Sequence, residues 1–126
     1  MRPDARVQVE RHFTSYLQNP EHFSYRPVLR HGDFGGSNIL FDPSTQAISG
    51  IIDFGSTTLG DPACDLAGLL WYGEQFMRKL ADTYPMTDQL WERIRFCHGT
   101  FALQEALFGV ENNDPDAFRA GIASYR

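Results

Sequence analysis

The sequence predicts a mostly helical α+β protein with one small β-hairpin. Two apolar runs, residues 38–41 and 48–54, are separated by the turn-forming stretch DPSTQA, which favours two short antiparallel strands. Most of the other segments carry apolar residues at helical spacing. Because a two-stranded ribbon is unstable alone, the hairpin is expected to pack on helices.

Before the hairpin, the sequence predicts one helix and an irregular connection. The helix is expected over residues 4–17, where Asp4 could cap its start and the Asn19-Pro20 pair would stop it. Residues 21–29 are expected to be irregular, because their sequence, EHFSYRPVL, shows no regular apolar period. They lead into a glycine-containing loop that precedes the hairpin.

A second helix is expected over residues 63–84. Asp61 would cap it, and Pro62 would occupy its first turn. Apolar residues at helical spacing predict one buried face. This face would contain Leu66, Leu69, Leu70, Phe76 and Leu80.

Two further helices are expected toward the end of the chain. One would run roughly over residues 87–108, and the other would follow the Asp114-Pro115 pair over residues 115–125. Trp71 and Trp91 lie among apolar neighbours, so both are expected in the core rather than at a ligand site.

Length and composition indicate one globular domain over residues 1–126. The chain is 42% hydrophobic and 21% charged, which is typical of a folded protein rather than a disordered one. Its net charge of −5 argues against a nucleic-acid partner, because phosphate neutralisation needs clustered Lys and Arg. No segment resembles a signal peptide or a membrane span. Cys64 and Cys97 are far apart, which favours reduced thiols and a cytoplasmic location.

Three polar side chains around the hairpin could form a phosphoryl-transfer site. Residues 30–42 read RHGDFGGSNILFD and hold Asp33 and Asn38 around a Gly-Gly turn. Such sites separate the carboxylate that orients the acceptor from the metal ligands. The amide oxygen of Asn38 and the carboxylate of Asp53 suit a hard cation, and the hairpin would bring them to one end of the ribbon. For Asp33 alone, a loop-capping role is an open alternative to catalysis.

Two motifs in this order resemble those of a known enzyme family. HGDFGGSN resembles the HGDxxxxN signature of the aminoglycoside phosphotransferase and choline kinase-like family, distant relatives of protein kinases. GIIDFGSTTLGDPACDLA resembles the family's metal-binding segment and its GDPxxDLA stretch. The kinase catalytic loop has the same spacing, with Arg in place of Gly32. The resemblance covers residues 25–70 and implies the C-terminal lobe of a protein-kinase-like fold.

The resemblance also implies a function. The chain would belong to an enzyme that transfers the γ-phosphate of ATP to a hydroxyl of a small molecule of the aminoglycoside, choline-like or homoserine-like class. Asp33 would be the catalytic carboxylate that orients the acceptor hydroxyl. Asn38 and Asp53 would bind Mg²⁺, and together with Ser37 they would contact the nucleotide.

Supporting roles are implied for residues around these three. His31 would brace the loop, which a simple packed histidine would also do. Asp65 would hold the loop by hydrogen bonds, although a carboxylate in the first turn of a helix is also favoured by the helix dipole. Gly35 and Gly36 would let the backbone approach a phosphate, but ordinary turn glycines explain them equally well.

Other polar residues suggest weaker candidates. The remaining histidines lack metal-ligand spacing with the cysteines, which argues against zinc; they are His12, His22 and His98. Ser37 lacks an identifiable base for a nucleophilic triad. Several acidic residues could receive a cationic substrate or form a solvated surface; they are Glu105, Glu111, Asp114 and Asp116.

The N-terminal nucleotide-binding lobe of the family is not expected within these 126 residues. They contain no glycine-rich strand-turn-strand and no strand resembling Val-Ala-Ile-Lys. The chain alone could therefore be inactive, and a non-catalytic binding or oligomerisation module is the alternative. The face that this lobe covers in relatives would then be open to self-association.

Overall fold

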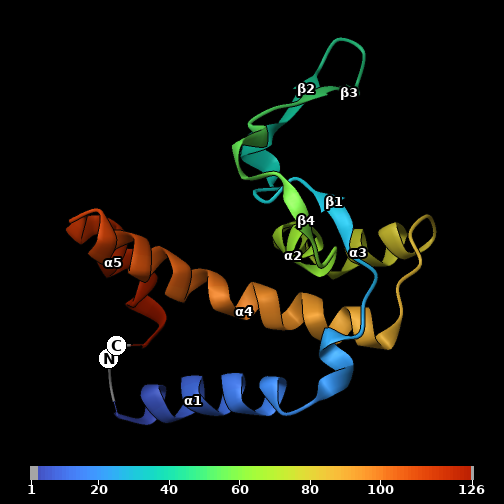
Figure 1. Cartoon of the computed structure of the whole chain (residues 1–126). Coiled ribbons are helices and arrows are strands. Elements are labelled where there is room, and N and C mark those ends of the chain that lie inside the picture. Colours follow the sequence, from blue (N-terminus) through green and yellow to red (C-terminus); the bar gives the residue numbers. More distant parts are fainter. Residues whose placement is uncertain (1–2, 126) are drawn as a thin grey trace. The chain divides into compact units, whose positions relative to one another are not determined.

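A computed structural model describes residues 3–125 of the chain (Figure 1). The described residues form two compact units. One unit contains the residues up to Ser24 together with those from Arg95 onward, and the other is Tyr25–Ile94. The mostly helical α+β class is confirmed. That the chain forms one domain stays a prediction.

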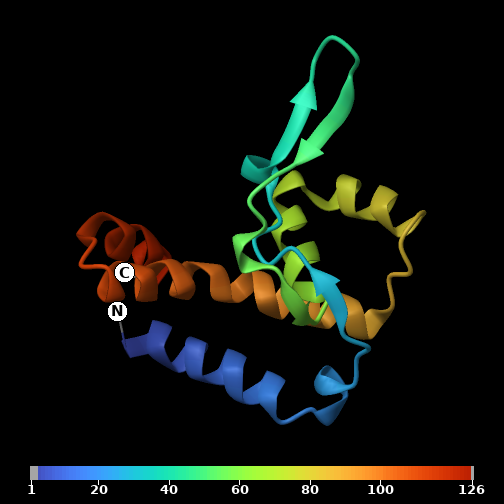
Figure 2. The ribbon, with the colours of Figure 1, turned by 45° about the horizontal axis from the view of Figure 1, so that its top comes forward.

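The first unit is helical. It contains α1, Pro3–Leu17, the C-terminal part of α4, Asp88–Glu111, and α5, Pro115–Gly121. Figures 1 and 2 both show α1 running alongside this part of α4. The Tyr16 ring stacks on Phe96 of α4, with the ring centroids 3.6 Å apart. Aromatic packing therefore holds the two helices together.

Polar side chains cap the starts of α4 and α5. Thr87 accepts a hydrogen bond from the Leu90 N–H through its hydroxyl at 3.1 Å, at the start of α4. Asp114 accepts from the first N–H groups of α5. The last predicted helix is shorter than expected, because α5 ends at Gly121 and a 3₁₀ turn, Ala123–Tyr125, follows.

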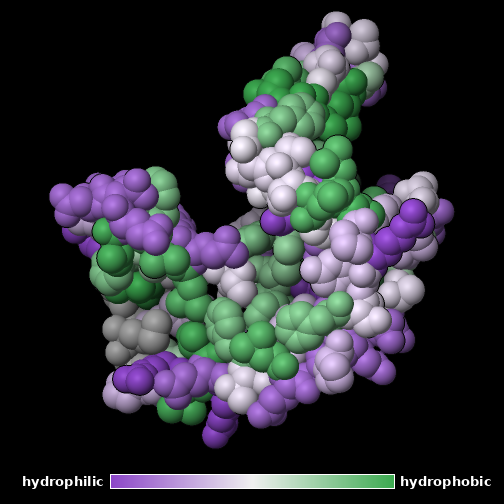
Figure 3. Space-filling model, in the orientation of Figure 1, coloured by the Kyte–Doolittle hydropathy of each residue, from purple (hydrophilic) through white to green (hydrophobic). Residues whose placement is uncertain are grey.

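The second unit contains the predicted hairpin. Its strands are β2, Ile39–Asp42, and β3, Ala47–Ile51, and Ile39 pairs with Ile51. A register shift between Leu40 and Phe41 marks a β-bulge. Many apolar side chains of the hairpin are exposed, and they appear as green, hydrophobic surface in Figure 3.

The same unit has a second pair of strands that the sequence did not indicate. Strand β1, Val28–Arg30, pairs antiparallel with β4, Thr58–Gly60. The irregular connection predicted over residues 21–29 is therefore wrong at its end, and a 3₁₀ turn, Pro20–Phe23, begins it. Strands of three residues are too short to show an alternating pattern.

The helix predicted over residues 63–84 is broken. The structure has α2, Ala63–Gly68, a 3₁₀ segment, Leu69–Tyr72, and α3, Glu74–Ala81. Gly73 separates the last two with φ of 88°, a left-handed conformation that glycine adopts without steric cost. The chain therefore changes direction at Gly73.

This break changes which side chains are buried. Leu66 and Leu69 lie in the core as predicted, but Phe76 is 40% exposed and Met77 is fully buried in its place. The prediction that Trp71 belongs to the core is wrong, since 76% of it is exposed. Within residues 3–125, no helix has the length and apolar character needed to cross a membrane.

Candidate functional site

The loop between β1 and β2 is anchored by one carboxylate of α2. Asp65 accepts a hydrogen bond from the His31 N–H at 2.7 Å and another from the Gly32 N–H at 2.9 Å. Gly32 has φ of 88°, and a side chain there would collide with the Ser56 carbonyl. Asp65 lies in the first turn of α2, and its two hydrogen bonds fix the start of the loop.

His31 is buried and connects this loop to the end of the hairpin. Its Nε2 lies 2.8 Å from the Ile52 carbonyl oxygen, and the Asp33 N–H donates to its Nδ1 at 3.3 Å. A neutral ring with its proton on Nε2 satisfies both contacts. The Phe54 ring packs against it, with centroids 4.8 Å apart. The ring thus braces the residue that the sequence predicts as catalytic.

Asn38 joins the loop to Asp33. Its amide Nδ2 donates to the Asp33 backbone carbonyl at 2.8 Å and to Asp33 Oδ2 at 3.1 Å. The residue is only 7% exposed. Because Nδ2 faces Asp33, the amide oxygen of Asn38 is left for another partner.

The hairpin brings Asn38 close to the segment that holds Asp53. The Ile52 N–H donates to the Asn38 carbonyl at 3.0 Å, which extends the strand pairing by one residue. Asn38 and Asp53 therefore lie at the same end of the ribbon. Asp53 is exposed and adopts φ of 64° and ψ of 62°, a left-handed conformation that is costly for most residues with a side chain.

The amide oxygen of Asn38 and the carboxylate of Asp53 suit a hard divalent cation. An amide oxygen and a carboxylate are ligands that Mg²⁺ accepts, and Mg²⁺ usually takes only one or two carboxylates from protein with phosphate and water completing its shell. Among the described residues, no three His, Cys, Asp or Glu side chains cluster as a metal site. Asn38 and Asp53 would thus be the protein's contribution to a shared site.

Ser37 is exposed on the 3₁₀ turn Gly36–Asn38. Its predicted contact with a nucleotide stays a prediction. The acidic residues near the C-terminus lie in the first unit: Asp114 caps α5, Asp116 pairs with Arg119, and Glu105 and Glu111 are exposed. Both the substrate-binding and the solvated-surface interpretations of these residues stay open.

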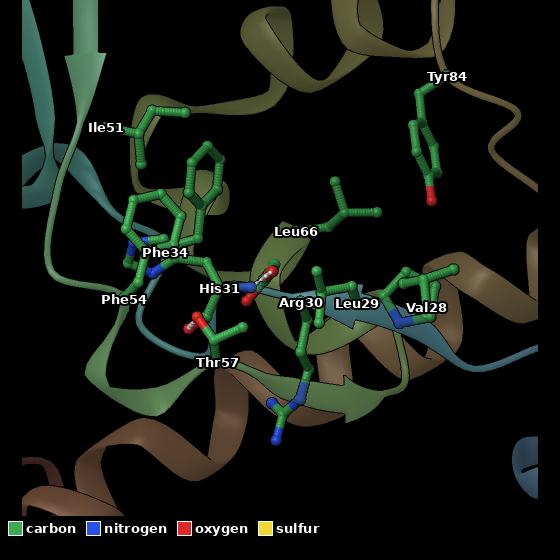
Figure 4. Close-up of a pocket in the computed structure, with 12 residues that line it drawn as sticks. Val28, Leu29, Arg30, His31, Phe34, Ile51, Phe54, Thr57, Leu66 and Tyr84 are labelled. Carbon is green, nitrogen blue, oxygen red and sulfur yellow. Dashed lines mark hydrogen bonds between the residues drawn. The ribbon is translucent and has the colours of Figure 1, made fainter.

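An apolar cavity of about 480 Å³ lies behind the loop (Figure 4). Phe34, Phe54 and Ile51 line one side of it, Val28 and Tyr84 lie at the other, and Leu66 points into it from α2. The cavity is in the size range of ligand pockets. However, Asp33, Asn38 and Asp53 do not line it, so it is not where a phosphate would meet these groups.

Sequence reasoning missed two contacts that shape the loop. Phe34 and Phe54 pack beside His31, and each directly follows one of the candidate aspartates. Gly68 of α2 lies against the Phe34 carbonyl and leaves no space for a side chain. The repeated Asp-Phe pair is the signal that could have revealed the first contact.

The comparisons with known proteins decide the family. The model of the phosphotransferase enzyme family matches residues 2–97. The chain belongs to this family. Viomycin phosphotransferase of Streptomyces vinaceus is 36% identical over 100 residues, which are 76% of this chain and 35% of that relative.

Solved structures of phosphotransferases show the same fold. The GDP complex of aminoglycoside 2'-phosphotransferase-IIIa is 26% identical, with a TM-score of 0.87 over 98% of this chain and 43% of that one. Macrolide 2'-phosphotransferase type I is also 26% identical, with a TM-score of 0.79 over 96% of this chain and 45% of that one. The phosphotransferase chain described here thus spans less than half the length of these relatives. The resemblance inferred from its motifs is confirmed.

Proposed function

We propose that this chain carries the acceptor- and metal-binding half of a phosphotransferase site. Asp33 orients and deprotonates the acceptor hydroxyl, and Asn38 and Asp53 hold Mg²⁺. The observation that carries the proposal is the pair of hydrogen bonds from Asn38 Nδ2 to the Asp33 carbonyl and carboxylate, 2.8 Å and 3.1 Å long. They place a candidate metal ligand directly beside the candidate base.

The surrounding contacts make this arrangement rigid. Asp65 holds the backbone of His31, and the His31 ring accepts the Asp33 N–H. Asp33 therefore needs little reorganisation to receive a hydroxyl proton. Positioned acid–base groups contribute about 10²–10⁴-fold to a rate. When bound, Mg²⁺ would supply positive charge to the nucleotide phosphates. Transfer of this kind depends mainly on positioning and electrostatic stabilisation.

The two substrates are proposed by class. We propose ATP as the phosphate donor, and GTP should be tested beside it, because solved relatives contain GDP. For the acceptor we propose a hydroxyl of a small molecule of the aminoglycoside, choline-like or homoserine-like class. A related structure that contains kanamycin, and the relatives named for viomycin and macrolides, support antibiotics as the first group to test.

Calorimetric titration of the full chain with ATP or GTP, with and without Mg²⁺, tests the metal half of the site. We expect Mg²⁺-dependent binding that Asp53→Asn abolishes. Asp82→Asn is the matched control, because Asp82 is an exposed aspartate at the end of α3. Absence of Mg²⁺-dependent binding, or equal effects of the two variants, would contradict the proposal for this chain.

Phosphate transfer tests the acceptor half. Radiolabelled γ-phosphate should appear on at least one member of a panel of aminoglycosides, viomycin, macrolides and amino alcohols. Asp33→Ala should remove this transfer while nucleotide binding persists. Transfer that survives Asp33→Ala would assign the base to another residue.

A second function is favoured by the exposed strands of the same unit. Leu29 and Leu59 are direct cross-strand partners and are 73% and 71% exposed. Large exposed apolar patches mark interaction surfaces, so this face could serve a non-catalytic binding module or a homo-oligomer. Sedimentation at increasing concentration should then show association that Leu29→Ser weakens, and a monomer at all concentrations would exclude the homo-oligomer.

A further inference from the structure

One face of the segment from α2 to the following 3₁₀ turn runs along the candidate catalytic loop. Asp65 binds the backbone of His31 and Gly32. Three residues later, Gly68 lies against the Phe34 carbonyl. Residues separated by three, four or seven positions share one side of a helix, and the next position on this side is Tyr72.

Tyr72 reaches the Gly-Gly turn of the loop with its hydroxyl. A Cβ atom added at Gly36 would lie 2.5 Å from the Tyr72 hydroxyl oxygen but 3.5 Å from Cζ of the same ring. The first distance is a steric clash and the second is an ordinary contact. A side chain at position 36 would therefore require the Tyr72 hydroxyl or the turn to move.

The backbone of Gly36 does not itself require glycine. The glycines with positive φ among residues 3–125 are Gly32 and Gly73. Gly36 begins the 3₁₀ turn, whereas Gly35 before it has an extended backbone, and no atom lies within 4 Å of the Cβ that Gly35 would carry. Position 35 would therefore accept alanine freely, whereas position 36 is restricted by Tyr72.

The phenol ring is held in place, and its hydroxyl has no hydrogen-bond partner among the described residues. The Phe76 ring lies beside it with centroids 5.1 Å apart. Tyr72 is 50% exposed. The turn that it touches is closed by the hydrogen bonds of Asn38 to Asp33, so the hydroxyl lies against the short loop that carries both residues.

We propose that Tyr72 is a positioning residue for phosphoryl transfer: its hydroxyl sets the conformation of the Gly35–Gly36 turn and thereby the spacing of Asp33 and Asn38. The proposal rests on the proposed function of these two residues. A displacement of about 1 Å at a reacting group can cost roughly a hundredfold in rate, so a small shift of this turn is enough to matter.

A set of four variants of the full chain tests this role: Tyr72→Phe, Gly36→Ala, the double variant and Gly35→Ala. Amide hydrogen exchange at Asn38, whose N–H donates to the Gly35 carbonyl at 3.0 Å, is the first measurement. Gly36→Ala should accelerate exchange there by about tenfold or more, because the new methyl group and the Tyr72 hydroxyl cannot both keep their places against the turn. Tyr72→Phe alone leaves the place of the hydroxyl empty and should accelerate exchange. The double variant should restore slow exchange, since the new methyl group fills that space and supports the turn in place of the hydroxyl. Gly35→Ala should change this exchange rate little, because its methyl group would meet no other atom.

Nucleotide binding is the second measurement, and a role in stability alone would not alter it. Gly36→Ala should weaken Mg²⁺-dependent binding of ATP, and adding Tyr72→Phe should recover it in part. The midpoint of thermal unfolding is measured for the same variants. If Gly36→Ala behaves like Gly35→Ala in exchange, or if Tyr72→Phe fails to offset it, the inference is wrong. If the unmodified chain binds no nucleotide, the proposed function fails, and the exchange data still decide whether Tyr72 sets the turn.

Discussion

Asp61 and Arg93 form a buried ion pair between the segment before α2 and the first part of α4. Arg93 Nε lies 2.8 Å from Asp61 Oδ2, and the two side chains are 7% and 11% exposed. The guanidinium also lies over the Tyr25 ring, 5.4 Å from its centroid. The other carboxylate oxygen of Asp61 accepts the Ala63 N–H at 3.0 Å. One residue thus caps α2 and neutralises a buried charge.

Asp61→Asn should lower the free energy of unfolding by about 3–5 kcal/mol, because it leaves the buried Arg93 without a counter-charge. The amide can still accept the Ala63 N–H, so the cap of α2 should persist. Urea denaturation followed by tryptophan fluorescence measures the loss.

Glu74→Gln is the control for this prediction. It removes the ion pair of Glu74 with Arg78, whose side chains are 78% and 74% exposed. An exposed pair of this kind contributes only about 0.3–0.5 kcal/mol. If the Glu74 and Asp61 variants lose the same stability, the Asp61–Arg93 pair contributes no more than an exposed pair and the prediction is wrong.

Asp65→Asn should loosen the start of the candidate catalytic loop. The carboxylate accepts two backbone N–H groups, but an amide has one acceptor oxygen and would turn an NH₂ donor toward the other N–H. The loss should be about 1–3 kcal/mol. Amide exchange should accelerate at His31 and Gly32, whereas exchange at the distant residue Leu90 changes only as global stability does. Equal acceleration at all three amides would indicate a global effect instead.

The sequence predicted the elements whose signals are local and long. The first helix, the hairpin and the helix after Thr87 have clear periodicity, caps and turn residues, and the structure has all three. Strands β1 and β4 escaped prediction because they are stabilised by pairing with each other across a separation of about thirty residues. The single helix expected over residues 63–84 failed because Gly73, tolerated in many helices, is here in a left-handed conformation.

The candidate site was easier to predict than its support. Asp33, Asn38 and Asp53 are joined by a hairpin that the turn residues already indicate, so their arrangement follows from local sequence. The contacts of Gly68 and Tyr72 with the loop depend on how α2 packs in three dimensions. Trp71 likewise shows that apolar neighbours in the sequence do not predict burial, because its side chain is exposed in the structure.

The turn of the hairpin should respond to acid. The side-chain and backbone hydrogen bonds from Ser44 hold the pKa of Asp42 below its ordinary value. Because the folded pKa is the lower one, the stabilisation is present above the pKa of the unfolded chain, about 3.9, and is lost as the pH falls through the folded pKa. The Ser44 amide shift, followed by NMR below about pH 5, should titrate, and Asp42→Asn should remove this titration. A shift that persists in the variant would assign the titration to another carboxyl.

Asp53 should show a conflict between stability and function. Its φ of 64° suits glycine best, although aspartate adopts it more readily than most residues with a side chain. Asp53→Gly relieves the cost of this conformation, although the more flexible unfolded chain offsets part of the gain. The free energy of unfolding should therefore rise, or change by less than about 1 kcal/mol, while Mg²⁺-dependent nucleotide binding disappears with the carboxylate.

Gln46→Gly separates these two effects. Gln46 has φ of 53° in the turn of the hairpin, so its substitution by glycine should have a similar effect on stability. It carries no predicted ligand, and nucleotide binding should therefore be unchanged. Thermal unfolding and calorimetry of the two variants together give the comparison. If Asp53 is kept for function, its replacement by glycine should cost nucleotide binding but little stability. A large loss of stability in Asp53→Gly would instead mean that the aspartate is kept for its structural contacts.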